Sequence, residues 1–127
     1  MKVAVAPGWT TELDHGPDWL FVKLYGPDTE EADATGLAES LQVLMEEELA
    51  HRVVLELDGL NDFPIGLADE LVELHGRVEE AGGIVRLCGV AAEHHEMLRR
   101  HERACSLTHY QDRADAVMGA YRPHKPR

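Results

Sequence analysis

The clearest hydrophobic pattern lies in the middle of the chain. Residues 52–57 form a nearly continuous run of apolar β-formers, which is typical of a strand covered on both faces. From residue 67 to residue 81, apolar side chains recur at alternating steps of four and three, which predicts one face of an amphipathic helix. Gly82 and Gly83 are expected to end this helix, because glycine adopts the left-handed conformation without a clash at Cβ. Residues 84–88 predict a second buried strand, so the pattern indicates a strand-helix-strand unit.

The loop between the first strand and the helix is the expected place for function. Parallel strands joined through a helix have a right-handed crossover, and such folds bind ligands and partners at the carboxyl ends of their strands. Here Phe63, Pro64 and Ile65 place three apolar residues where solvent is expected. Phe63 and Ile65 can either fold inward and seal the core or form an apolar contact patch. Pro64 stiffens the loop in both cases.

The remaining pattern extends this unit to one α/β domain. Strands are expected at 9–13 and 18–25, joined as a hairpin, with a last short strand at 105–109. The predicted order is β-β-α-β-α-β-α-β-α, a mixed sheet of four to five strands with about four helices. We expect a domain over residues 1–121 and a disordered basic tail over 122–127. The inward residues expected on the first, third and fourth helices are Leu37, Leu41, Leu44 and Met45; Met97, Leu98 and His101; and Ala114, Val117, Met118 and Tyr121.

The two ends of the first helix are predicted from its capping residues and its charges. Asp33 or Thr35 is expected to cap its start, and the helix is expected to end near Ala50. The glutamates at 46–48 then lie at the end of the helix where the dipole disfavours negative charge. We interpret them as a solvated helix end.

Net charge, apolar runs and cysteine content indicate which partners and which compartment to expect. The 127 residues carry a formal net charge of −12, which disfavours nucleic acid and anionic lipid as partners. The sequence has no apolar run near the ~18 residues of a membrane span and no leader pattern, so we expect a cytoplasmic protein without direct membrane insertion. Cys88 and Cys105 are then expected to be free buried thiols.

Candidate chemistry is sparse. The segment 93–102 contains His94, His95 and His101, but no two of them have the spacing that brings metal ligands together on one helical turn. We therefore interpret this helix as a polar surface and expect no tight metal site. The sequence contains no glycine-rich phosphate loop and no nucleophile at a strand-to-helix turn. An enzyme is not indicated, and no cofactor is expected.

The central unit carries a family resemblance. Its motifs are Val-Val-Leu-Glu-Leu-Asp-Gly-Leu at 53–60, Gly66-Leu67 opening a helix that continues through Leu71 and Leu74, Ala-Gly-Gly at 81–83, and Gly-Val at 89–90. This pattern resembles the STAS domain, a family named after sulfate transporters and anti-sigma factor antagonists. The resemblance is best over 52–90 and extends over residues 9–120.

The resemblance implies a protein-binding module. An anti-sigma factor antagonist of this family binds an anti-sigma factor, a serine kinase of the ATPase-fold class, and thereby frees a sigma factor. The family carries a phosphorylatable Ser or Thr before the glycine of the loop, where this chain has Ile65, so binding would be constitutive or differently regulated. The partner-binding residues implied are Asp28, Asn61, Asp62, Phe63, Pro64, Ile65 and Gly66.

Two other functions fit the same pattern. STAS domains also occur in membrane transporters, so the chain could be an accessory subunit of a transporter. A small-ligand-binding or metal-binding domain is the third possibility, with the histidine-rich helix as its only support.

Overall fold

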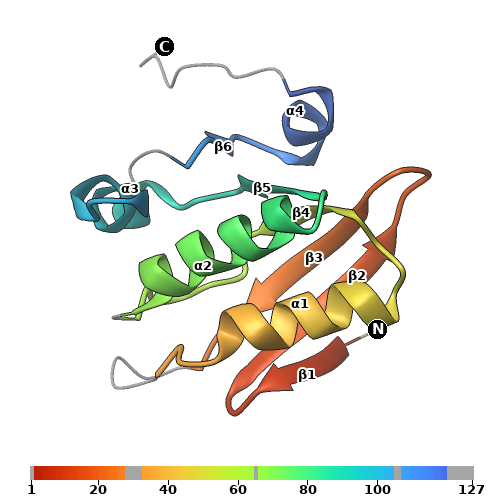
Figure 1. Cartoon of the computed structure of the whole chain (residues 1–127). Coiled ribbons are helices and arrows are strands. Elements are labelled where there is room, and N and C mark those ends of the chain that lie inside the picture. Colours follow the sequence, from red (N-terminus) through yellow and green to blue (C-terminus); the bar gives the residue numbers. More distant parts are fainter. Residues whose placement is uncertain (1, 28–32, 65, 105–106, 120–127) are drawn as a thin grey trace.

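The computed structural model describes residues 2–27, 33–64, 66–104 and 107–119. Its strands form one mixed sheet in which the strand order is the chain order (Figure 1). β1, β2 and β3 are antiparallel, and β4, β5 and β6 continue the sheet parallel to β3. The strands are β1 (Lys2–Ala6), β2 (Trp9–His15), β3 (Leu20–Tyr25), β4 (Arg52–Glu56), β5 (Ile84–Cys88) and β6 (His109–Tyr110). The helices are α1 (Leu37–Glu47), α2 (Leu67–Glu80), α3 (Ala92–Arg100) and α4 (Arg113–Met118).

The α/β fold class is confirmed. Within the described ranges the sheet has six strands instead of four to five, because β1 was missed. β1 pairs antiparallel with β2, and the Thr11 hydroxyl donates to the Val3 carbonyl at 3.1 Å. Val3 and Val5 pack against the main core. Their spacing of two residues is the strand signal that the sequence offered, in a run too short to stand out.

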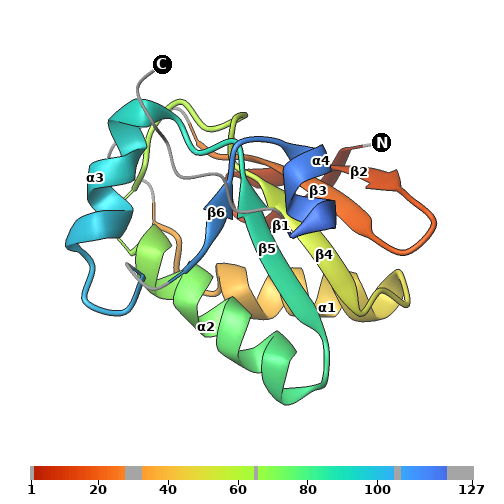
Figure 2. The ribbon, with the colours of Figure 1, turned by 90° about the horizontal axis from the view of Figure 1, so that it is seen from above.

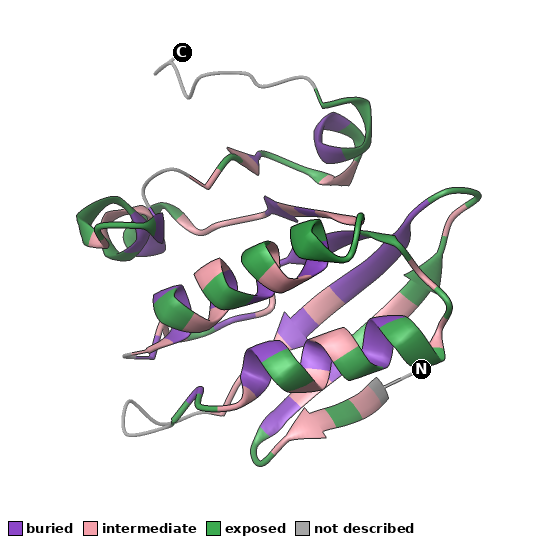
Figure 3. Cartoon of the chain, viewed as in Figure 1, coloured by how far each residue is buried: buried purple, intermediate pink, exposed green. Residues whose placement is uncertain are grey.

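The two faces of the sheet are covered differently. α1 and α2 lie side by side on one face and α4 lies on the other (Figure 2). Crossovers between parallel strands share one hand, so strands added in one direction place their connecting helices on one face. α4 follows the last strand and is not bound by this rule. The buried stripes of α1 and α2 face the sheet, and their exposed residues face outward (Figure 3).

The inward residues of α1 are confirmed, and those expected on the later helices are confirmed only in part. Leu37, Leu41, Leu44 and Met45 are buried, and so is Leu98 of α3. Other positions differ from expectation. Met97 is 40% exposed and His94 is buried in its place. On α4, Asp115 and Ala116 are buried, whereas Ala114, Val117 and Met118 are exposed. Tyr121, Cys105 and the proposed tail lie outside the described residues.

Helix α4 differs because it is short. It begins after Asp112, whose Oδ1 accepts from the Asp115 backbone N–H at 2.9 Å. With six residues it completes fewer than two turns, so apolar periodicity cannot define its face. Ala116 instead packs with Cys88 and Tyr110 in a second, smaller core cluster. Over the described residues, every helix is too short or too polar to cross a membrane.

The start of α1 also differs from expectation. Its N-cap is Gly36, in the left-handed region at φ 84°, and not Asp33 or Thr35. The Asp33 carboxylate instead accepts from the backbone N–H and hydroxyl of Thr35 at 2.9 and 2.5 Å, and these two hydrogen bonds lower the Asp33 pKa. Asp33 and Thr35 therefore form a turn of their own that precedes the Gly36 cap.

Candidate functional site

The loop between β4 and α2, described over residues 57–64 and at Gly66, lies at the carboxyl ends of the parallel strands, and its first residues contact β3 and β5. The Leu57 N–H donates to the Cys88 carbonyl at 2.9 Å, and Leu60 is buried in the main core. A Cβ at Gly59 would lie 2.9 Å from the Leu24 carbonyl oxygen, so only glycine allows this approach to the end of β3. The start of the loop therefore packs closely between the ends of β3 and β5.

The start of the loop is also tied by charge. The Asp58 carboxylate lies 3.3 Å from Nζ of Lys23 on β3. Its hydrogen bond and charge are the largest causes that raise the Lys23 pKa. On the other side, a Cβ at Gly89, which has φ +70°, would lie 3.1 Å from the Asp58 Cβ. Asp58 thus packs between the ends of β3 and β5.

The predicted partner-binding residues divide into inward and outward side chains. Pro64 is buried, and its carbonyl accepts from the Leu67 N–H at 3.1 Å. Phe63 is half-buried and packs on the main core, so this side chain folds inward. Asn61 is exposed and Asp62 is half-buried, while Gly66 caps α2 in the left-handed region at φ 94°. Asp28 and Ile65 lie outside the described residues.

Histidines of the α3 region hold the loop and α2 together, a role that sequence reasoning missed. His94 is 7% exposed, and its ring centroid lies 5.6 Å from that of Phe63. His101 Nε2 lies 2.5 Å from the Asp69 carboxylate of α2, while its Nδ1 accepts from the Ala104 N–H at 3.0 Å. Since Nδ1 accepts, Nε2 carries the proton and donates to Asp69.

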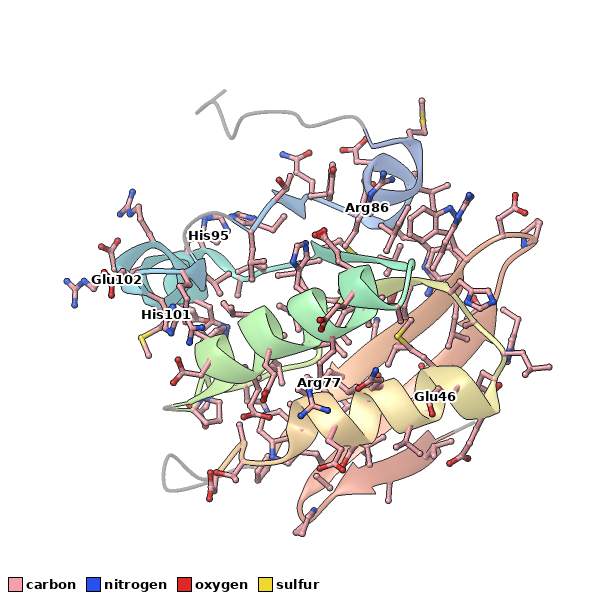
Figure 4. All side chains as sticks on the ribbon, in the orientation of Figure 1. Glu46, Arg77, Arg86, His95, His101 and Glu102 are labelled. Carbon is pink, nitrogen blue, oxygen red and sulfur yellow. The ribbon has the colours of Figure 1, made fainter. Side chains whose placement is uncertain are left out.

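Most of α3 is the polar surface that the sequence predicted, with Glu93, Arg99 and Arg100 exposed, but His94 is buried. His94 stands four residues before buried Leu98, and that spacing was an available signal for an inward face. His95 turns toward its own loop and donates from Nε2 to the Val90 carbonyl at 3.1 Å. Figure 4 shows His95 and His101 projecting from the α3 region toward different parts of the molecule. In the described part of the chain, no group of three or more His, Cys, Asp or Glu side chains is placed to hold a metal ion.

The starts of α1 and α2 are joined through a carboxylate. Neither helix has a side-chain hydrogen bond at its glycine N-cap. Glu70, in the first turn of α2, accepts from the Ala38 N–H of α1 at 2.9 Å. A carboxylate at a helix start is stabilised by the helix dipole. Glu70 therefore satisfies one donor of α1 and fixes the two helix starts relative to each other.

Cys88 ends β5, and its carbonyl accepts from the Leu57 N–H at the start of the loop. Burial is the largest cause that raises the pKa of its thiol to about 12, and the carboxylates of Glu56 and Asp58 add to the rise. The thiol is buried and free, as expected from the sequence. Because the thiolate is the reactive form, a thiol that remains protonated at neutral pH does not act as a nucleophile.

Comparison with known proteins identifies a solved structure with a similar fold. No protein-family model and no curated protein matches the sequence. Among solved structures, a serine-to-glutamate variant of RsbS from Moorella thermoacetica matches with a TM-score of 0.67 and 13% sequence identity, over 86% of this chain and 92% of that chain. Identity at this level establishes the fold alone. The chain has the STAS-like α/β fold that its central motifs implied.

Proposed function

We propose that the chain is a non-enzymatic, protein-binding regulatory module that resembles an anti-sigma factor antagonist. The observation that carries this proposal is that the start of the β4–α2 loop is fixed against β3 and β5, with Asn61 and Asp62 following at the carboxyl ends of the strands. A contact surface that is already ordered loses little entropy on binding. The fold shared with RsbS adds support.

The negative charge of this surface favours a partner with a basic surface. Asp62 and Asp69 lie beside the start of α2, within a chain of net charge −12. Complementary charge steers association and suppresses wrong partners, so the partner presents a basic surface. The STAS resemblance supports an anti-sigma factor of the serine-kinase type as this partner.

Regulation by phosphate on this loop does not fit the residues present. The segment Asn61–Leu67 contains no hydroxyl side chain, and Ile65 stands directly before Gly66, where the family carries its phosphoacceptor. Asp69 and Glu70 already place carboxylates in the first turn of α2. We infer that this loop binds its partner without a phosphate switch.

Reversing the charge of Asp62 is expected to weaken partner binding by about 10-fold, because a lysine there would face the basic surface of the partner. The matched control is Glu80→Lys, an exposed charge reversal at the other end of α2. The wild type and both variants are used to capture partners from the native organism, and the dissociation constant of the captured kinase is then measured by calorimetry. A kinase that binds all three proteins equally, or a captured transporter subunit in its place, would contradict the proposal.

Incubation with the captured kinase and ATP is expected to leave the β4–α2 loop unmodified, because the loop has no hydroxyl acceptor. Phosphate is mapped by mass spectrometry, and binding is measured before and after incubation. Stoichiometric phosphate on another residue such as Thr108, together with loss of binding, would show that the switch exists at a different position.

A further inference from the structure

The turn after α1 has an unusual residue at its key position. The Ala50 N–H donates to the Met45 carbonyl at 2.9 Å, and the Leu49 N–H donates to the Glu46 carbonyl at 3.1 Å. This pair of bonds is the Schellman motif, whose left-handed residue is usually glycine. Here that residue is Leu49, at φ 54°.

The end of α2 shows the usual solution in the same chain. The Gly83 N–H donates to the Val78 carbonyl at 2.8 Å, and the Gly82 N–H donates to the Glu79 carbonyl at 3.0 Å. The left-handed residue of this second Schellman motif is Gly82, at φ 85°. The two neighbouring helices therefore end with the same pair of hydrogen bonds. The left-handed residue is glycine after α2 and leucine after α1.

Leucine is unfavourable at position 49 for two separate reasons. An L-residue in the left-handed region brings its Cβ close to the following carbonyl oxygen, a clash that glycine avoids. The Leu49 side chain is also 85% exposed, so it gains almost no burial in return. Strained residues that do not stabilise the core often occur where a protein binds a ligand or a partner.

Leu49 stands between two hollows of the surface. The first, of about 290 Å³, lies between the ends of α1 and α2 and is lined by apolar side chains that include Met45, Val78 and Ala81. The second, of about 360 Å³, lies against the turn between β2 and β3 and includes Trp19. Leu49, Ala50 and His51 line both. An apolar segment laid over this turn would cover Leu49 and fill the hollows on either side.

The rim of the first hollow is acidic. Glu46 lines it and is exposed, and Glu47, Glu79 and Glu80 are exposed on the adjoining helix ends. Arg77 extends from α2 toward α1 (Figure 4), where it bonds to Gln42 Oε1 at 3.2 Å and lies 3.5 Å from Glu73. The second hollow has Arg52 in its lining. A second copy of this chain would bring carboxylates against carboxylates, which like-charge repulsion disfavours.

We propose that this turn is a second docking surface, with Leu49 as its apolar anchor, for a cationic amphipathic segment of a partner protein. The surface lies at the opposite ends of α1 and α2 from the candidate site described above (Figure 1). An apolar anchor excludes water while the carboxylates pair with Lys or Arg at the rim. The surface is separate from the β4–α2 loop, so one can fail while the other stands.

The test uses the whole chain and a synthetic amphipathic helical peptide with leucine on one face and lysine on the other. We expect the wild type to bind this peptide and to show amide shifts at Leu49 and His51 in NMR spectra. Leu49→Gly is expected to weaken binding by about 10-fold while the melting temperature stays equal or rises, because glycine suits the left-handed position. A purely structural role for Leu49 would not move binding and stability in opposite directions.

Control variants test whether peptide binding depends on Leu49 itself, on any exposed apolar side chain, or on the β4–α2 loop. Val43→Ala removes another exposed apolar side chain of α1 and is expected to bind the peptide normally, as is Asp62→Lys. Glu80→Lys is expected to weaken peptide binding. Equal binding by wild type and Leu49→Gly would overturn the proposal. So would equal binding of a peptide with glutamate in place of lysine, or a wild-type dimer that Leu49→Gly dissociates.

Discussion

Arg113→Ala is expected to lower the free energy of unfolding by about 2 to 4 kcal/mol, because it leaves a buried carboxylate without its partner. Arg113 Nε donates to Glu56 Oε1 at 2.6 Å, and Glu56 is 5% exposed in the middle strand β4. Arg113 Nη1 also donates to Asp14 at 2.6 Å, and the guanidinium lies 4.2 Å from the centroid of the Phe21 ring. The hydrogen bond to Glu56 is the largest cause that raises the Arg113 pKa.

Urea unfolding at neutral pH measures this loss. The matched control is Arg99→Ala, which removes a 74% exposed arginine paired with Glu96 on α3 and is expected to cost less than about 1 kcal/mol. Adding Glu56→Gln to Arg113→Ala is expected to recover part of the stability, since position 56 then carries no buried charge. An Arg113→Ala loss as small as that of Arg99→Ala would mean that water reaches the Glu56 carboxylate.

Gly83→Ala is expected to destabilise the domain by about 3 kcal/mol. A Cβ at this position would lie 2.4 Å from the His51 carbonyl oxygen and 2.8 Å from Val78 Cγ1. The His51 carbonyl cannot move away freely, because it accepts from the Ile84 N–H at 2.8 Å where β4 and β5 begin. Gly83 is therefore required by the close approach of two backbone segments.

The matched control is Gly76→Ala in the same helix-turn unit. Gly76 is exposed in the interior of α2, and a Cβ there meets nothing within 4 Å. Alanine is expected to stabilise the helix by about 0.5 to 1 kcal/mol, because glycine loses more backbone entropy. Thermal melts of the two variants should therefore shift in opposite directions. A Gly83→Ala protein that melts with the wild type would show that β4 and β5 can part at this end without loss.

The central unit could be predicted from the sequence because its runs are long and regular. β4, α2 and β5 occur where the pattern placed them, and the pairing of Arg52 with Ile84 makes the two strands parallel. Gly82 adopts the left-handed conformation expected at the end of α2. Short elements gave weaker signals. β1 has five residues and α4 has six, too few for either period to stand out from chance.

The candidate site could be placed but not described from the sequence. The loop lies at the carboxyl end of β4, as strand-helix-strand geometry requires. The contact between His101 and Asp69 joins residues 32 positions apart, and the ring contact of Phe63 with His94 depends equally on how α3 returns to the loop. Side chains from distant segments meet through tertiary packing, which local patterns do not encode.

The agreement between strand order and chain order bears on how the protein forms during synthesis. Each strand from β2 onward pairs with the strand that precedes it in the chain, and no strand is inserted between two earlier ones. On the ribosome, every new strand therefore meets an edge that has already emerged, and no completed pairing has to reopen. Each pairing between neighbouring strands spans one hairpin or one crossover. The sheet can thus be completed from its N-terminal edge, with β6 added last.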